Sequence, residues 1–111
     1  MAKYHILNRA VDDLTEIWNY TFDEWSEKQA DKYYELLLEG CNELANNPLL
    51  GKEYHEISNK LLGYKWGEHI IFYITCDTNE IEVVRILHSR MDLKKKFLLR
   101  NKSSYTKSNF H

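Results

Sequence analysis

The stretch that decides the fold is residues 69–88, which read HIIFYITCDTNEIEVVRILH. Residues 69–76 are apolar at consecutive positions, as expected of a strand that is covered on both faces. Residues 77–79 (DTN) favour a turn, and residues 80–88 are again rich in β-branched side chains. The stretch therefore predicts a β-hairpin in the middle of a sheet.

Shorter segments on either side complete the predicted sheet. Residues 61–66 can form a strand that ends at Gly67, and residues 3–7 (KYHIL) read as a short first strand. Residues 49–60 are predicted to be an irregular polar connector. Residues 91–99 could form a last helical turn or two, and a polar tail at 101–111 follows.

Two amphipathic helices are predicted between the first strand and the connector. The apolar positions of the first follow helical spacing from Ala10 to Trp25, with Asn8 as the expected N-cap. The second begins at Ser26, where SEKQ is a capping box, and ends before Pro48, which cannot continue a helix. Because almost no linker separates them, they should form a helical hairpin.

The predicted element order is therefore β-α-α-β-β-β, which defines an α+β fold. The apolar stripes of a helical hairpin must be buried, and the sheet is the only large apolar partner available. We expect the hairpin to pack on one face of a mainly antiparallel sheet. With 111 residues, the chain is predicted to hold a single domain over residues 1–100.

Composition and charge narrow the class of protein. Aromatic residues make up 14% of the chain, no stretch approaches the roughly 20 apolar residues of a membrane span, and no signal peptide is recognisable. Cys41 and Cys76 are isolated and are interpreted as buried, reduced thiols, which fits a cytoplasmic protein. Charge is unevenly distributed along the chain. Residues 1–84 carry seven Lys/Arg and sixteen Asp/Glu, whereas residues 85–111 carry eight Lys/Arg and one Asp/Glu. The cationic end suggests an anionic partner, although it could also be a solvated tail that complements the acidic body.

Several short motifs resemble the RelE/ParE toxin superfamily, and the ParE-like branch in particular. The resemblance runs from residue 4 to residue 92 in the expected order. It is carried by Asp13-Leu14, Trp25, Gln29-Ala30 and Tyr33 in the two helices, Pro48 and Gly51 after them, residues 63–65 (GYK) and 69–73 (HIIFY) in the sheet, and residues 85–92 (RILHSRMD) at the end. The last of these motifs is the most specific.

The resemblance implies the RelE-like fold and a type II toxin–antitoxin system, of the kind associated with plasmid stabilisation. ParE-type toxins poison DNA gyrase, and RelE-type relatives cleave mRNA on the ribosome. Both are neutralised by an antitoxin, which for this chain would be ParD-like. No cofactor is implied, and the sequence contains no metal-ligand spacing, nucleophile elbow or glycine-rich phosphate loop.

Arg85 and His88 are the leading candidate site residues. Strict alternation along the last strand places Arg85 on the same face as Ile81, Val83 and Leu87, where a charge needs a partner. Arg85 therefore either pairs with a carboxylate of the body or grips an anion or a target protein. His88 is interpreted either as a structural histidine at a strand end or as a general acid or base. His69 is interpreted as structural.

A ribonuclease would need a base, an acid and several cations at the phosphate. The available groups are Lys65, Arg85, His88 and Arg90, and the surrounding body is acidic. No catalytic residue is therefore assigned firmly, and we favour a toxin that acts by binding over a nuclease.

Binding to a target or antitoxin is predicted to use the cationic end and the exposed aromatic residues. The residues in question are Arg85, His88, Arg90, Lys94, Lys95, Lys96, Trp18 and Trp25. An antitoxin helix is expected to lie against the helical hairpin or across the sheet.

Overall fold

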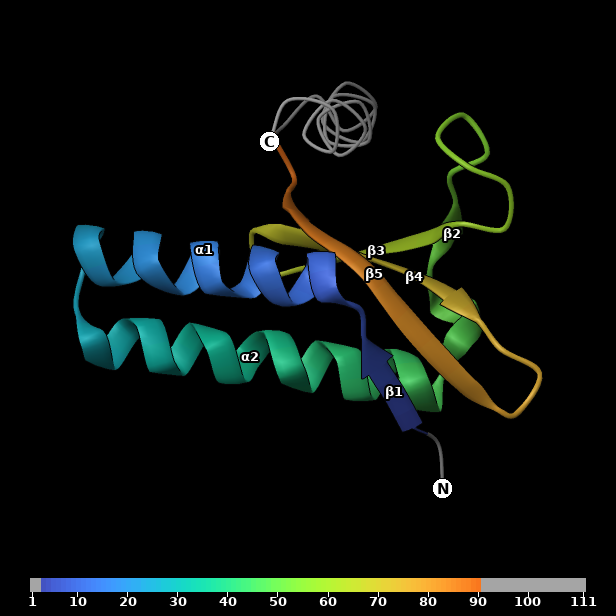
Figure 1. The fold of residues 1–111 in the computed structure, drawn as a ribbon, viewed down its shortest axis with the longest axis horizontal. Helices are drawn as coiled ribbons and strands as arrows, with labels where there is room; N and C mark the ends of the chain where they lie inside the picture. The colour runs from blue at the N-terminus through green and yellow to red at the C-terminus, as the bar shows by residue number, and fades with distance from the viewer. Residues whose placement is uncertain (1–2, 91–111) are drawn as a thin grey trace, which may run out of the picture.

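The computed structural model describes residues 3–90 as two helices packed on one face of a five-stranded mixed sheet (Figure 1). The elements are β1 (Lys3–Ile6), α1 (Asn8–Glu24), α2 (Glu27–Asn46), a short 3-10 turn (Pro48–Leu50), β2 (Lys52–Glu53), β3 (Leu62–Trp66), β4 (His69–Thr75) and β5 (Glu80–His88). The predicted α+β fold is confirmed. The helical turns expected at 91–99 and the tail at 101–111 lie outside the described residues.

The strands are arranged in the order β1-β5-β4-β3-β2. β1 pairs with β5 in parallel, and the other neighbours are antiparallel. The predicted central hairpin is present: Cys76 donates its N–H to the carbonyl of Glu80 at 2.8 Å, and Asn79 adopts a positive φ of 63°, which asparagine tolerates. The sequence missed the two-residue strand β2 inside the connector.

The helical hairpin begins and ends as its sequence requires, with one exception. Ser26 caps α2 by accepting the backbone N–H of Gln29 at 3.1 Å, as predicted. Asn8 was expected to cap α1, but it lies in the first helical turn, the N-cap is Leu7, and no side chain caps the helix. The reason is that β1 runs almost directly into α1, where Leu7 donates its N–H to Val83 of the sheet.

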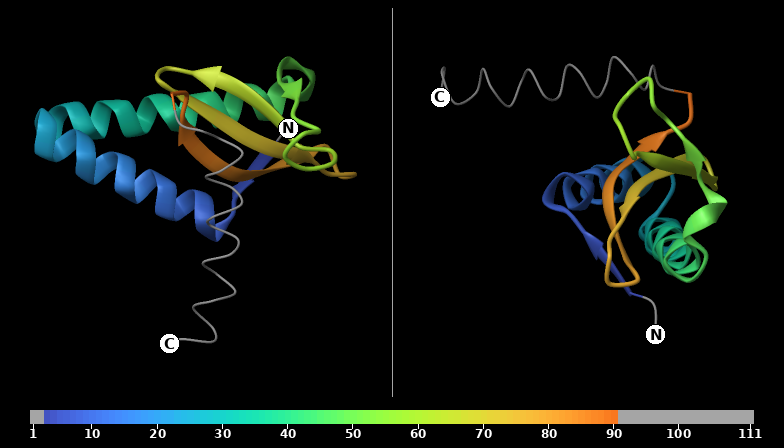
Figure 2. Two further views of the ribbon diagram at one scale, coloured as in Figure 1. Left: turned by 90° about the horizontal axis from the view of Figure 1, so that it is seen from above. Right: turned by 90° about the vertical axis from the view of Figure 1, so that its right-hand side faces the viewer.

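The main core lies between the hairpin and the sheet. It includes Leu14 of α1, Leu37 and Cys41 of α2, and Tyr73 and Val83 of the sheet. The close approach of α2 depends on Gly40, since a Cβ there would lie 2.8 Å from the side chains of Ile71 and Trp66. Figure 2 shows the two helices as one layer, and the sheet as a second layer that covers only part of their length.

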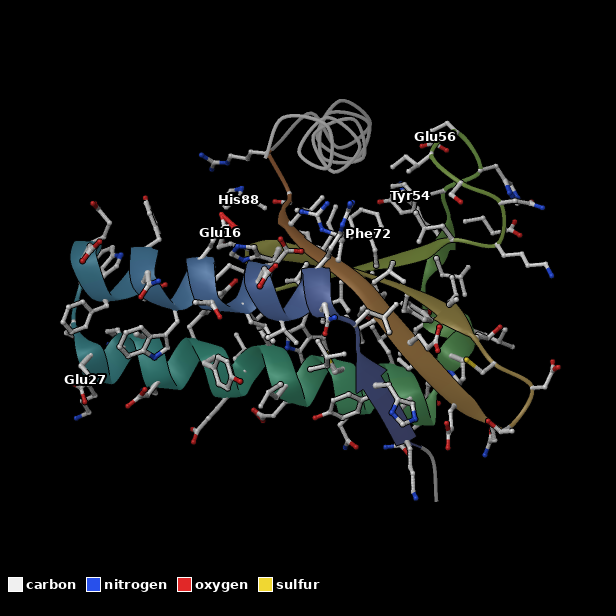
Figure 3. The ribbon with its side chains drawn as sticks, viewed as in Figure 1. Glu16, Glu27, Tyr54, Glu56, Phe72 and His88 are labelled. Carbon is white, nitrogen blue, oxygen red and sulfur yellow. The ribbon has the colours of Figure 1, made fainter. Side chains whose placement is uncertain are left out.

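A smaller apolar cluster lies on the opposite face of the sheet. Tyr54 and Leu61 of the connector pack there on Ile70, Phe72 and Leu87. The rings of Tyr54 and Phe72, both labelled in Figure 3, meet edge to face with centroids 5.1 Å apart. The connector is therefore not merely a polar loop, because it covers part of this second face.

The two cysteines differ in environment. Cys41 is buried, as predicted, and burial raises the pKa of its thiol to about 12. Cys76 was expected to be buried but is partly exposed, because it lies just beyond the end of β4 at the turn. Within residues 3–90, neither helix is both long and apolar enough to cross a membrane.

Candidate functional site

The candidate residues of the last strand are positioned by a buried ion pair between α1 and β5. Arg85 donates from Nε to Asp13 Oδ2 at 2.8 Å and from Nη2 to Asp13 Oδ1 at 2.9 Å. The two side chains are only 2% and 4% exposed. A bidentate pair of this kind fixes both the distance and the rotation of the two groups.

The carboxylate of Asp13 also satisfies the backbone of β5. β1 ends at Ile6, which is paired with Val83, so the backbone of Ile86 lies beyond the last residue of β1. There the N–H of Ile86 donates to Asp13 Oδ2 at 2.9 Å. Asp13 thus supplies the acceptor that a longer β1 would have supplied, and it joins α1 to the edge of the sheet.

Of the two interpretations of Arg85, the structure shows the pairing with a body carboxylate. Its guanidinium is buried, so in this conformation it does not present its donors to a partner at the surface. The face expected for Arg85 is wrong with respect to Val83 but correct with respect to Leu87. A bulge opposite Phe72 and Tyr73 shifts the alternation, so Arg85 lies opposite Phe72, on the face that Leu87 shares, whereas Val83 lies opposite Tyr73 on the other face.

Two histidines face each other at the end of the sheet. His69 of β4 and His88 of β5 are register partners, and their rings meet edge to face with centroids 5.2 Å apart. Tyr33 of α2 lies 2.6 Å from His69 Nδ1 and accepts the backbone N–H of Glu68 at 2.9 Å. The Tyr33 hydroxyl therefore joins α2 both to His69 and to the turn before β4.

The environment keeps His69 neutral at physiological pH. Burial and, to a smaller extent, the neighbouring His88 lower the pKa of His69 to about 4, although Glu68 and Asp13 act in the opposite direction. A ring that stays neutral in this way and is hydrogen-bonded to a tyrosine hydroxyl is a structural element of the sheet end. This agrees with the interpretation of His69 made from the sequence.

His88 and Arg90 lie closer to the surface than Arg85. His88 Nδ1 accepts the backbone N–H of Arg90 at 3.1 Å, and Ser89 donates its N–H to the carbonyl of Glu68 at 3.0 Å. The bond from Ser89 holds the end of β5 against the turn between β3 and β4. His88 is labelled at the end of β5 in Figure 3, and the Arg90 side chain is exposed.

The predicted site residues do not gather in one place. Lys65 lies opposite Ile70 in register, on the face of the second apolar cluster, whereas His88 lies opposite His69 on the helix face. Trp18 lies in the second half of α1, and Trp25 is the residue that ends it. This end of the helical hairpin lies away from the sheet (Figure 1). Trp18 donates to Asp31 Oδ1 at 3.0 Å and stacks on Phe22. Lys94, Lys95 and Lys96 lie outside the described residues.

The sequence analysis missed Asp13 and Tyr33 as residues that build this site. Asp13 was named only among the residues that carry the family resemblance, and no partner was assigned to it. The signal was its position between Ala10 and Leu14 on the apolar stripe, where a carboxylate needs a buried cation. Within residues 3–90, no group of three His, Cys, Asp or Glu side chains is placed to hold a metal ion.

Two helices packed on one face of a five-stranded mixed sheet form the small α+β fold of the RelE/ParE structural class. Solved structures with the same fold include a chromosomal ParDE toxin–antitoxin system from P. aeruginosa, with a TM-score of 0.68 and 16% identity, covering 79% of this chain and 96% of that chain. The toxin–antitoxin complex RelBE2 from Mycobacterium tuberculosis matches with a TM-score of 0.62 and 16% identity, covering 78% of this chain and 96% of that one.

Sequence comparison identifies the family within this class. The model of the ParE toxin of the type II toxin–antitoxin system parDE matches residues 4–93, and the chain belongs to this family. Toxin ParE1 of Mycobacterium tuberculosis is 35% identical over 92 residues, which cover 83% of this chain and 94% of that toxin.

Proposed function

We propose that the protein is the toxin of a type II toxin–antitoxin pair of the plasmid-stabilisation kind, and that it acts in the cytoplasm by binding and inhibiting DNA gyrase. The observation that carries this proposal is the separation of the groups that a ribonuclease would use. Arg85 is neutralised by Asp13, and Lys65 and His88 lie on opposite faces of the sheet. Cleavage of RNA requires such groups to converge on one phosphate.

The acidity of the described surface supports the same choice. Residues 3–90 carry nine Lys/Arg and sixteen Asp/Glu, a balance of −7. Binding of mRNA depends on cations that neutralise its phosphates, so a body of this charge is poorly suited to hold RNA. A toxin that binds a protein target has no such requirement.

The proposal is tested with purified protein in two assays. We expect loss of gyrase supercoiling, accumulation of cleaved DNA complexes and no cleavage of mRNA on programmed ribosomes. Arg90→Ala, at the exposed end of β5, is expected to weaken gyrase inhibition, whereas Lys52→Ala on the short strand β2 serves as the control. Ribosome-dependent cleavage that His88→Ala abolishes would instead establish the RelE-type endonuclease activity.

Neutralisation by a ParD-like antitoxin belongs to the same proposal. The two solved structures of similar fold are of toxin–antitoxin systems, and the helical hairpin of this chain exposes apolar side chains that a partner could cover. Val11 and Phe22 are each 45% exposed and lie eleven residues apart, on one face of α1, and Trp25 at its end is 77% exposed. An amphipathic antitoxin helix laid against α1 would remove this surface from water.

A further inference from the structure

An acidic groove runs along the outer side of α2, where the helix meets the edge of the sheet. It has a volume of about 470 Å³ and is lined by Glu35, Leu38, Glu39, Asn42, Glu43 and Trp66. Leu38 and Trp66 give it an apolar floor, and the three glutamates form its rim. The groove is separate from the Asp13–Arg85 pair and from the tip of the helical hairpin.

The floor of the groove is held rigidly. Trp66 donates from Nε1 to the backbone carbonyl of Leu36 at 2.7 Å, and its ring lies against the position of Gly40. At Trp66 β3 is also an edge of the sheet, because β2 pairs only with Leu62 and Gly63. The indole is therefore fixed in place while the groove beside it remains open.

The rim of the groove has an unfavourable charge pattern. Glu35, Glu39 and Glu43 follow one another at four-residue spacing, so each repels the next along the same face of α2. None of the Lys, Arg or His side chains in residues 3–90 forms a salt bridge with them. A row of like charges above an apolar floor is complementary to a segment that is both cationic and apolar.

The chain itself contains a segment of that chemistry. Residues 93–100 read LKKKFLLR, with four cations and four apolar residues, and residues 91–111 together carry six Lys/Arg and one acid. The family match ends at residue 93, so nearly all of this segment lies beyond the part of the chain that resembles ParE toxins. We propose that residues 93–100 dock in the α2 groove of the same molecule, with their cations on the glutamate rim and their apolar side chains on Leu38 and Trp66.

The place where the described chain ends allows this contact. Ser89 is hydrogen-bonded to Glu68 in the turn that leads back to Trp66, so Arg90 follows directly beside that turn. β5 and β3 are separated only by β4, which is about 10 Å at the usual strand spacing. Three extended residues span roughly 10 Å, so a segment that starts at Leu93 can reach the groove.

The test uses the full chain with Cys76→Ser and Ser103→Cys, and a nitroxide attached to the new cysteine; Cys41 is buried and stays unlabelled. We expect the nitroxide to broaden the amide NMR signals of Leu38, Glu39 and Asn42, and to leave that of Trp25 sharp. Loss of this pattern is expected in Glu39→Lys. Asp23→Lys makes the same change of charge on the exposed side of α1 and should keep the pattern.

A charge exchange and a mixing experiment complete the test. Glu39→Lys combined with Lys95→Glu should restore the broadening, because the ion pair is re-formed with its signs reversed. The proposal would be overturned if the amide signals of the groove stayed sharp in the labelled protein without further substitutions. It would also be overturned if Glu39→Lys and Asp23→Lys reduced the broadening equally. Broadening of an isotope-labelled copy by a separate nitroxide-labelled copy would overturn it in favour of a second molecule as the occupant. Neither gyrase nor antitoxin is present, so the result is independent of the proposed function.

Discussion

At the residue scale, the most consequential contact is the buried pair between Asp13 and Arg85. We predict that Asp13→Ala lowers the free energy of unfolding by about 3–5 kcal/mol, because Arg85 is left buried without its carboxylate and Ile86 loses its acceptor. Urea unfolding followed by circular dichroism measures this change. Asp12→Ala, an exposed neighbour in α1, should shift the free energy by less than about 0.5 kcal/mol. Equal effects of the two substitutions would show that the Asp13–Arg85 pair does not stabilise the folded protein.

His69 is predicted to make the stability of the folded protein depend on pH. Its pKa is about 4 in the folded protein and about 6.5 in the unfolded chain, so only the unfolded state binds a proton between these values. Stability should therefore be constant above pH 6.5 with respect to this group and fall as the pH drops towards 4. Because the ring is partly exposed, we expect a loss on the order of 1–2 kcal/mol rather than the full shift.

The matched variant for this prediction is His69→Gln, whose side-chain oxygen can accept the Tyr33 hydroxyl but does not titrate. Urea unfolding of both proteins at pH 7.5, 5.5 and 4.5 separates this histidine from the other titrating groups. We expect the difference in stability between the two proteins to shrink or reverse on acidification. Parallel pH profiles would rule out His69 as the source of the dependence.

At the scale of elements, the contact between α2 and the sheet depends on the absence of a side chain at position 40. Alanine at this position would gain about 1 kcal/mol of helix propensity, but its Cβ would lie 2.8 Å from Ile71 and Trp66. Overpacking typically costs about 1–3 kcal/mol, so Gly40→Ala should be neutral to destabilising and Gly40→Val clearly destabilising. Thermal unfolding measures both, with Asn42→Ala on the exposed face of α2 as the control. A more stable Gly40→Ala protein would contradict the close contact.

The start of α2 offers a second test at this scale. Ser26→Ala should lower the free energy of unfolding by about 1 kcal/mol, since the N–H of Gln29 loses the hydroxyl that caps it. Ser58→Ala, in the exposed connector, should have little effect. Chemical denaturation measures the free energy of unfolding of both variants. Equal values for the two would show that the cap does not stabilise the protein.

At the scale of the whole molecule, the charge and the exposed apolar surface are unevenly distributed. The tip of the helical hairpin extends beyond the sheet and carries Trp25, which is 77% exposed (Figure 2). Under the proposed function, Trp25→Ser should weaken antitoxin binding at least tenfold, or about 1.4 kcal/mol, with little change in stability. Leu49→Ser is the control, because Leu49 is 93% exposed at the other end of α2. Isothermal titration in which both variants bind alike would exclude the hairpin tip from the interface.

The sequence by itself determined the elements of this protein, because helical spacing, caps, turns and apolar runs act between residues close in the chain. Examples are the cap at Ser26, the turn at residues 77–79 and the fully apolar strand β4. Only the tertiary structure decided which carboxylate meets Arg85, where the alternation of β5 breaks, and that β1 lies parallel to β5. The reason is that β1 ends before β5 does, so the remaining edge of β5 must find its acceptor in α1. Asp13 and Arg85 are 72 positions apart, so no local sequence pattern predicts their contact.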